Sequence, residues 1–548
     1  MGRSVVGLAL ALLAVPLPAD AAEPQIALLR DRQAGIYTVH YGTDCPLGKT
    51  DLECSQRDTQ VEPSISVNPT DPLNAIAVYQ EGRFDGGGAV TNGFATTLDG
   101  GRTWTHGHIP GVTKLTGGPY DRASDPVVDF GPDGTAYMNS LVTSEAGPLS
   151  LALNVSRDGG RTWEPPSFFA ELLASVGVTG VDKNWMVVDR GTGPGHHPGR
   201  IYIVWNLPVG VLYAYTDDEG ATWEYGDAGL PVHPQGHGVI PLVMPNGDLA
   251  IVFGTAAYAP NPTAVAGTND VLGTTMVVSI ARGAGSVPTG APLVFTPPTP
   301  IARYRGRAHR GQRAGDGLPS AAVDANSGAL YAVWNDARFR TDFVNDIVIS
   351  RSTDGGTTWT APMRVNPESA EYVDHSTPMV GVGSDGAVHV AYRRRRETAG
   401  DPSTFDKRIE TIHQVSRDGG RTFSAPMSVS TVDSDMAFGA RSRNGVFLGD
   451  YSQIATGGDL TYIVRTEPVR VSTSEPRRFP PAYHHQRTWV AVVGPVVERS
   501  TTQRPKVLGR ELPRTGVGVM PLAVIAAAIG SLLMRALVGR APGWRQRP

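Results

Sequence analysis

The sequence predicts an all-β protein folded as a single β-propeller, and two repeated patterns lead to this prediction. The first pattern is an eight-residue phrase, S/T-x-D-x-G-x-T-W/F. Its hydroxyl and carboxylate can bond the backbone of a tight turn, its glycine accepts a positive φ, and its final aromatic residue starts a new strand. The phrase, known as the Asp-box, occurs five times and predicts a hairpin each time, starting at Thr97, Ser156, Thr216, Ser352 and Ser416.

The spacing of the boxes indicates how many structural units the chain contains. Successive box aspartates lie 59, 60, 136 and 64 residues apart. The long interval is about twice the others, so one unit has lost its box, and Ser279–Ser286 lies where that box would be. A fixed period of this length, with short β-runs and Gly/Pro turns, is typical of a propeller with one four-stranded blade per period.

The second pattern is an apolar strand, a turn and another strand, repeated before each box. A seventh such hairpin starts at Asp450 and has no box after it, only a third apolar run at Thr488. Its outer strand can come from the N-terminal segments IALLRD or GIYTVHY, which would close the ring and leave no open sheet edge. We therefore expect seven blades. Six is the alternative, in which the Asp450 hairpin and the terminal segments complete a neighbouring blade or decorate the ring.

The composition agrees with an exported β-protein. The 548 residues include 65 Gly and 44 Pro, as many turns require, and the net charge of −4 gives no basic excess for nucleic acid. The two cysteines, Cys45 and Cys54, lie in one short segment before the first blade, where we expect a disulfide. Two cysteines argue against a thiolate metal site, and we expect neither a metal nor a cofactor.

Both ends of the chain carry export and anchoring signals. Residues 1–21 combine Arg3, an apolar run and a small-x-small cleavage site, which indicates a secretory signal peptide. Residues 22–60 form an N-terminal segment with the closing strand and the two cysteines, and residues 61–493 form the propeller. Residues 494–511 are polar and contain Arg and Pro, as expected of a spacer.

Residues 512–548 contain Leu512, Pro513, Thr515 and Gly516 in the order LPRTG, then an apolar run and four arginines. This three-part order resembles the LPxTG sorting signal of bacterial wall-anchored proteins, in which sortase cuts between Thr and Gly. The resemblance implies a cell-surface protein joined to the wall through Thr515. A plain C-terminal membrane anchor is the alternative, because 18 apolar residues nearly span a bilayer.

Topology keeps the five boxes away from a catalytic centre. In a four-stranded blade the box lies between the third and fourth strands, on the same face as the turn between the first and second strands. The opposite face carries the loops that gather polar groups around a central mouth. We therefore expect structural roles for the box aspartates Asp99, Asp158, Asp218, Asp354 and Asp418.

Charged residues are frequent in the loops of that opposite face. Asp182 leads into the third blade and Asp450 opens the seventh. Arg83 and Arg338 each follow a strand aromatic residue by four positions, and an ion pair with the acid two positions earlier would make them structural. Recognition of an anionic ligand would make them site residues. Five further arginines lead into the fifth blade: Arg303, Arg305, Arg307, Arg310 and Arg313.

With these features the chain resembles the sialidase (neuraminidase) superfamily over roughly residues 60 to 490, particularly the secreted bacterial proteins named exo-α-sialidase-like. In that family a tyrosine is the nucleophile, a glutamate activates it, an aspartate is the acid/base, and three arginines bind the substrate carboxylate. The resemblance implies that Tyr451, followed by Ser452, is the nucleophile and that Asp85 is the acid/base. It further implies that Arg83, Arg338 and Arg393 bind a carboxylated sugar.

The chain departs from the family pattern at two functional positions. The family's Arg-Ile-Pro motif appears as Val61-Glu62-Pro63, without its arginine. No suitable activating glutamate precedes the hairpins at Gly247, Gly328 and Gly386. Losing both groups would weaken hydrolysis of an anionic sugar by several powers of ten if nothing replaces them.

Three functions therefore stay open. The first is a wall-displayed exo-glycosidase of sialidase type. The second is a propeller that binds acidic glycans or proteins without turnover. The third is a glycosidase that uses two carboxylates, drawn from Asp85, Asp182, Asp336 and Asp450.

Overall fold

The computed structural model describes residues 26–33, 55–56, 59–144, 149–169, 181–207, 210–226, 236–255, 275–307, 309, 311–313, 317–342, 344–367, 372–396, 408–442, 445–469 and 485–495. These residues belong to a compact unit, Met1–Val496, and a second unit, Val497–Pro548, lies outside them. The predicted signal peptide, the predicted Cys45–Cys54 disulfide and the predicted sortase motif all lie outside the described residues. Within the described ranges, no helix is long and apolar enough to cross a membrane.

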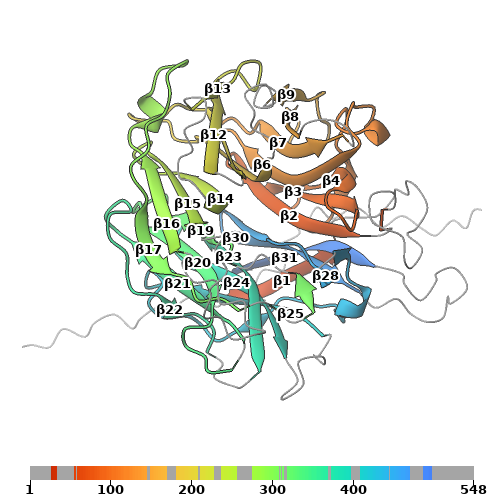
Figure 1. The fold of residues 1–548 in the computed structure, drawn as a ribbon, viewed down its shortest axis with the longest axis vertical. Coiled ribbons are helices and arrows are strands. Elements are labelled where there is room, and N and C mark those ends of the chain that lie inside the picture. Colours follow the sequence, from red (N-terminus) through yellow and green to blue (C-terminus); the bar gives the residue numbers. More distant parts are fainter. Residues whose placement is uncertain are drawn as a thin grey trace, which may run out of the picture. The chain divides into compact units, whose positions relative to one another are not determined.

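The described chain is all-β, as predicted, apart from short 3-10 turns such as η3 (Met436–Phe438). Most of its strands form antiparallel units of four, and in six of these units the strands are connected in sequence order (Figure 1). The first three units are β2 (Gln60–Asn68), β3 (Asp71–Arg83), β4 (Ala89–Thr97) and β5 (Thr105–His108); β6 (Arg122–Phe130), β7 (Ala136–Thr143), β8 (Ser150–Ser156) and β9 (Ser167–Phe169); and β10 (Asp182–Val188), β11 (Ile201–Leu207), β12 (Gly210–Thr216) and β13 (Glu224–Tyr225).

The next three units follow the same order. They are β14 (Gly236–Val243), β15 (Leu249–Thr255), β16 (Thr275–Ala281) and β17 (Thr299–Arg303); β19 (Ser320–Val323), β20 (Leu330–Asp336), β21 (Asp346–Ser352) and β22 (Met363–Arg364); and β23 (Val373–Val382), β24 (Val388–Arg396), β25 (Glu410–Ser416) and β26 (Met427–Ser428). The first and second units are joined by one residue pair, Ala89 with Ala123.

The last unit combines both ends of the described chain. It consists of β29 (Gln453–Gly457), β30 (Leu460–Pro468), β31 (Gln486–Pro495) and β1 (Ile26–Gln33). Strand β1 pairs antiparallel with β31, from Ile26 opposite Pro495 to Gln33 opposite Trp489. The N-terminal strand therefore provides the outer edge of a sheet whose other strands are C-terminal, which ties the ends together.

The first strands of the units contact one another in a closed cycle. Strand β2 contacts β6, and the sequence of contacts continues through β10, β14, β19, β23 and β29, which contacts β2 again. Apolar side chains fill the space between neighbouring sheets: Ile65 and Tyr79 of the first unit pack with Tyr462 and Val490 of the last. The first strands therefore surround a common axis, and their ends determine which residues can meet there.

The box residues form the predicted turns. In the second box, Asp158 Oδ1 accepts hydrogen bonds from the amides of Arg161 and Thr162, and its Oδ2 accepts one from the Thr162 hydroxyl at 2.6 Å. Asn74, beside the first hairpin turn, donates to the Gly159 carbonyl of that box at 3.0 Å. The box of one unit thus packs against the first hairpin of the preceding unit, which places both kinds of turn on one side.

Candidate functional site

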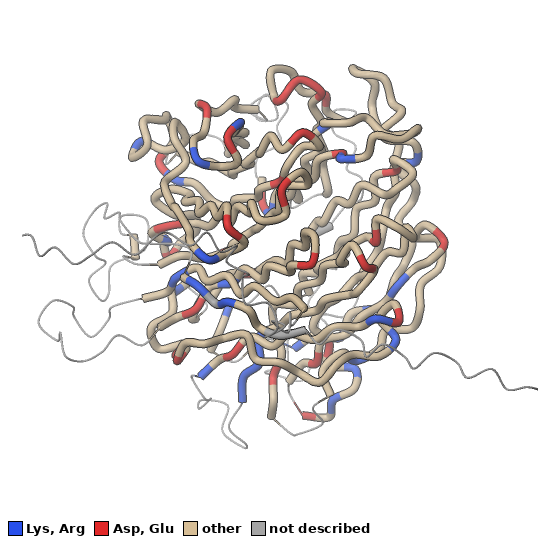
Figure 2. Tube along the Cα trace, turned by 180° about the vertical axis from the view of Figure 1, so that it is seen from behind, with Lys and Arg blue, Asp and Glu red and all other residues tan. Residues whose placement is uncertain are grey.

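A cluster of eight side chains forms where the first strands begin, at the ends remote from the boxes. We call it the central cluster, and its members are Glu62, Arg83, Asp125, Asp182, Lys183, Arg313, Asp450 and Tyr451. They come from several sheets, and hydrogen bonds, ring contacts and mutual electrostatic effects connect them. Acidic and basic positions are interspersed along the described trace, so neither sign dominates the described part of the chain (Figure 2).

A repeated irregularity in the first strands positions three of these side chains. The pairing register of β2, β6 and β10 with their partners shifts at the same point of each strand. Glu62, Asp125 and Lys183 lie at these shifts, with φ of 53°, 42° and 51°. Residues with a Cβ rarely adopt such φ, at a cost of about 1–3 kcal/mol each, and such strain is typical of functional sites. The bulges therefore hold charged groups at the axis against their conformational preference.

The carboxylates of Glu62 and Asp125 share one donor. Gln80 Nε2 donates to Glu62 Oε2, and also contacts Asp125 Oδ1 at 3.3 Å. The backbone amide of Lys183 donates to Asp125 Oδ2 at 3.0 Å. Burial raises the pKa of Glu62 well above its usual value, and the nearby Asp125 and Asp450 raise it further. Glu62 is thus a buried carboxyl that holds its proton unusually strongly.

Two arginines of the cluster stack on one phenylalanine. A small sheet of β18 (Gln312–Arg313), β27 (Arg441–Ser442) and β28 (Gly445–Phe447) places Arg313 beside Phe447. The Arg313 and Arg83 guanidinium carbons lie 4.4 and 4.5 Å from the Phe447 ring centroid. Arg313 also donates to Asp450 Oδ2 at 2.8 Å. The phenylalanine therefore holds the two guanidinium groups next to the carboxylates, and the uncharged ring leaves both groups with their positive charge.

The ammonium of Lys183 lies between two aromatic rings. Its Nζ is 3.8 Å from the ring centroids of both Trp185 and Tyr451. The two rings meet edge to face, with centroids 5.2 Å apart. Neither Lys183 Nζ nor the Tyr451 hydroxyl has a hydrogen-bond partner in the described residues, and both atoms are buried. Burial lowers the pKa of Lys183 to about 8 and raises that of Tyr451 well above its usual value.

Asp182 is the solvent-exposed acid of the cluster. Its backbone neighbour Lys183 donates an amide hydrogen to Asp182 Oδ1 at 3.0 Å. Although the residue is exposed, surrounding protein atoms partly desolvate its carboxylate. This desolvation, together with the charges of Asp125 and Asp450, raises the pKa of Asp182 to about 6. Asp450 is largely buried, with 16% of its side chain exposed, and is paired with Arg313. The cluster thus offers one reachable carboxyl that titrates near neutrality and a second that is ion-paired.

The structure brings only some of the sequence-predicted site residues together. Tyr451 and Arg83 belong to the central cluster. Asp85 lies half-buried in the loop between β3 and β4, and the carboxylates that most affect the Tyr451 pKa are Asp125, Glu62, Asp450 and Asp182 instead.

The other two predicted arginines bond to the protein scaffold. Arg338 pairs with Asp336, the acid two positions earlier, at 2.7 Å and also donates to the Arg303 carbonyl, so its contacts are those of a structural residue. Arg393 is buried and donates to the carbonyls of Leu448 and Thr466, both at 3.1 Å. Burial lowers the Arg393 pKa to about 10. These contacts fix both guanidinium groups outside the hydrogen-bond network of Glu62 and Asp125.

Sequence reasoning passed over Glu62 and Asp125 as site residues. Each precedes a proline at the start of an apolar first strand, in Glu62-Pro63 and Asp125-Pro126, and Thr377-Pro378 repeats this placement in another unit. An acid before proline at an equivalent place in two repeats was therefore the available signal. Within the described residues, no group of three or more His, Cys, Asp or Glu is arranged to hold a metal ion.

Comparisons with known proteins give distant structural likenesses. No protein-family model matches the chain, and no curated protein does. An ulvan lyase of polysaccharide lyase family PL25 is similar over 80% of this chain and 95% of its own, at 11% identity and a TM-score of 0.44. A Penicillium chrysogenum α-L-arabinanase is similar over 67% of this chain and 92% of its own, at 12% identity and a TM-score of 0.39. A Ruminococcus gnavus intramolecular trans-sialidase is similar over 63% of this chain and 92% of its own, at 12% identity and a TM-score of 0.38. At such identities and TM-scores, none of these proteins transfers a substrate or a residue role to this chain.

Proposed function

We propose that the four-stranded units are the blades of one seven-bladed β-propeller that hydrolyses glycosides at the central cluster. The closed cycle of contacts among the first strands supports the propeller. The hydrolytic function is supported by the exposed carboxyl of Asp182, which lies within the electrostatic influence of the Arg313–Asp450 ion pair. The resemblance of the box repeats to sialidases favours a sugar as the substrate.

The chemistry rests on two carboxylates in different environments. Glycosidases need one carboxyl that protonates the leaving oxygen and another that stays ionised to attack, or to activate water. Asp182, with its pKa raised to about 6, suits the acid. Asp450 suits the base or nucleophile, because Arg313 holds its carboxylate in place through an ion pair at 2.8 Å. This assigns the paired-carboxylate mechanism to two of the four acids that the sequence offered.

The arginines favour an acidic sugar. Arg313 is partly exposed, with 37% of its side chain accessible, and lies beside the buried Arg83 on the Phe447 ring. A guanidinium next to the reacting carboxylates would bind a sugar carboxylate and offset its repulsion from Asp450. We therefore propose a carboxylated glycan as the substrate.

Tyrosine catalysis of sialidase type is the second candidate, and the position of Glu62 favours it. Glu62 is among the charges that most affect Tyr451, and in its ionised form its carboxylate would be a base that takes the proton of the phenol. Lys183 against the ring face would stabilise the phenolate. The Tyr451 hydroxyl is buried, so this mechanism requires a movement that exposes it to the substrate.

We further propose that the protein is exported and displayed on a bacterial cell surface. The support is the order of signal peptide, propeller, spacer and LPRTG segment in the sequence. Covalent attachment by sortase through Thr515 is the favoured form, and anchoring by the C-terminal apolar segment is the alternative.

Turnover assays separate these proposals. The purified chain is offered aryl sialosides, aryl glucuronides and neutral aryl glycosides, together with Asp182→Asn, Asp450→Asn and Tyr451→Phe variants. Loss of turnover in both aspartate variants, with Tyr451→Phe retaining activity, is the expected result. Loss in Tyr451→Phe as well as Asp182→Asn would establish the tyrosine mechanism. Absence of turnover with every substrate would overturn the hydrolytic proposal and leave a glycan-binding propeller.

A further inference from the structure

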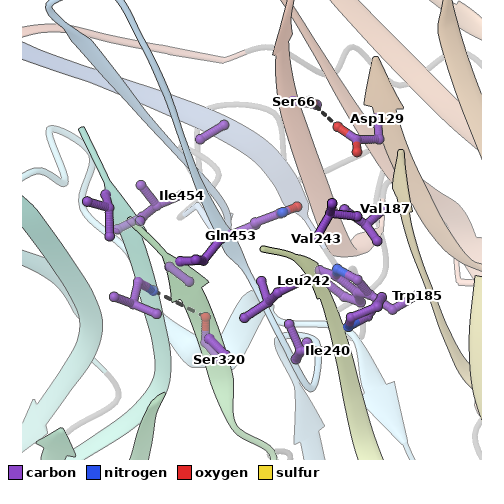
Figure 3. A pocket seen from close by; sticks show the side chains of 18 of the residues that line it. Ser66, Asp129, Trp185, Val187, Ile240, Leu242, Val243, Ser320, Gln453 and Ile454 are labelled. Carbon is purple, nitrogen blue, oxygen red and sulfur yellow. Dashed lines mark hydrogen bonds between the residues drawn. The ribbon is translucent and has the colours of Figure 1, made fainter. Parts of the chain in front are cut away.

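A cavity of about 570 Å³ lies along the first strands, and Trp185 and Tyr451, whose rings contact Lys183, are part of its lining. Figure 3 shows its side chains converging from separate strands. Most of them are apolar, including Ile65, Val187, Ile240, Leu242, Val380 and Ile454. A volume of this size matches the roughly 300–1,000 Å³ of sites that hold small organic molecules.

The aromatic pair separates this cavity from most of the charges of the central cluster. Trp185, Tyr451 and Asp450 line the cavity, whereas Glu62, Arg83, Asp125 and Lys183 do not. At its other end the lining includes Arg190 and the exposed turn residue Ala325, which lie by the first hairpin turns. The cavity therefore opens on the side of the Asp-boxes, and its chemistry differs from that of the glycosidase site.

Gln453 is a polar residue of the lining with an unused hydrogen-bond donor, and the lining residues Asp450 and Ser452 also have side-chain oxygens without a partner among the described residues. Gln453 Oε1 accepts hydrogen bonds from the Ser64 hydroxyl at 2.8 Å and the Ile65 amide at 3.0 Å. This fixes the orientation of the amide and leaves its NH₂ with no protein acceptor among the described residues. Near the rim, Asp129, Ser66 and Arg190 bond to one another. Asp129 accepts a hydrogen bond from the Ser66 hydroxyl at 2.8 Å and forms an ion pair with Arg190.

We propose that this cavity binds a neutral, mainly apolar small molecule that carries a carbonyl or other hydrogen-bond acceptor. The apolar lining favours burial of a hydrocarbon or aromatic body, because roughly 25 cal/mol is gained per Å² of apolar surface removed from water. The Gln453 NH₂ supplies the donor that selects an acceptor on the ligand. A carboxylated sugar is disfavoured, because most of the lining residues are apolar and cannot replace the hydration of its many hydroxyl groups. The inference goes beyond the proposed glycosidase and stands independently of it.

The experiment uses two ligands of nearly equal size, 2-acetylnaphthalene, which has a carbonyl, and 2-ethylnaphthalene, which has none. Each displaces the fluorescent probe N-phenyl-1-naphthylamine from the purified full-length chain. Leu242→Trp fills the cavity, and Leu212→Trp is the matched control, since Leu212 is also partly buried but lies outside the lining. If detergent is needed to keep the full-length chain in solution, it takes up the same amount of ligand in every sample. A difference in probe displacement between variants therefore measures binding in the cavity.

Leu242→Trp is expected to weaken both ligands at least tenfold, while Leu212→Trp leaves them unchanged. Gln453→Met is expected to weaken 2-acetylnaphthalene about five- to tenfold and to spare 2-ethylnaphthalene, whose retained binding shows that the variant is folded. Gln453→Glu, which keeps both acceptor bonds, should share the selective loss. Equal effects of the two tryptophan variants, or displacement of the probe by a glycoside, would overturn the proposal.

Discussion

Carboxylates lie on both sides of the molecule, near the Asp-boxes and at the central cluster, but their surroundings shift their pKa values in opposite directions. On the box side, Asp354 accepts hydrogen bonds from the hydroxyl and amide of Thr358, which lower its pKa to about 2. At the central cluster, Glu62 and Asp182 lie among other carboxylates with few donors, and their pKa values rise. The same chemical group is thus a fixed anion that stabilises a turn at one end and a carboxyl with a raised pKa at the other.

The contrast teaches that donors and burial, rather than the number of acids, decide which carboxylates can do chemistry. A box aspartate has several N–H and O–H groups arranged by the local sequence, so it needs no long-range partner. An acid of the cluster owes its environment to strands that are far apart in the chain. Function is therefore expected at the end where the local sequence does not satisfy the acid.

The largest expected effect is on turnover. Asp182→Asn removes the exposed acid, and we expect the turnover of the best aryl glycoside to fall by about 10²–10⁴-fold. The matched change Asp158→Asn, in a box, should leave turnover within about twofold, because that carboxylate lies on the other side. The measurement is kcat for both variants at pH 5.5. Similar losses in the two variants would show that the two ends do not differ in function.

The next effect is a gain in stability. Burial and neighbouring acids raise the folded-state pKa of Glu62 above its unfolded value, so its contribution is fully present below pH 4.5 and is lost as pH rises through the folded pKa. Glu62→Gln keeps the shape and removes this loss. We expect its free energy of unfolding at pH 8 to exceed the wild-type value by about 1–2 kcal/mol, with no gain at pH 4. Urea unfolding at both pH values tests this, and a loss of stability at pH 8 would contradict it.

The box side should respond with the opposite sign. Asp158→Ala removes the acceptor of two amides and two hydroxyls, and we expect unfolding to become easier by about 1 kcal/mol near neutral pH. Hydrogen bonds from Thr162 and its neighbours outweigh partial burial and lower the pKa of Asp158. Its stabilisation is therefore present above pH 3.8 and is lost as pH falls through the lowered pKa. Unfolding curves at pH 7 and pH 3 measure this, and an equal penalty at both would refute it.

The two ends also differ in how far the sequence predicts them. Each box turn is encoded within eight adjacent residues, and each hairpin within about fifteen, so strand positions and turns follow from local chemistry. The cluster depends on β2, β6, β10 and the segment around Arg313 meeting at one axis. It also depends on bulges that rotate Glu62 and Lys183 inward, and a residue's neighbours along the chain do not specify such a rotation.

Arg393 illustrates the limit. Local similarity to a family motif suggested that it binds a ligand, yet its guanidinium bonds the carbonyls of Leu448 and Thr466. Its partners lie more than fifty residues away along the chain. The side of β24 on which Arg393 lies decides whether its guanidinium bonds the backbone of other strands or reaches a ligand. Arg313 shows the reverse, because a two-residue strand beside Phe447 places it next to Asp450.

The smallest expected effect is a shift of the pH profile, and it tests whether the cluster acts as one electrostatic unit. A general acid must be protonated, so activity should fall as pH rises through the Asp182 pKa of about 6. The charge of Arg313 lowers that pKa. Arg313→Gln should therefore raise it and move this limb of the kcat profile to higher pH by about half a unit. Arg338→Gln is the control, because Arg338 pairs with Asp336 in a separate loop and should leave the limb in place. A limb that is unmoved in Arg313→Gln, or moved equally in both variants, would mean that Asp182 is not the acid whose ionisation limits turnover.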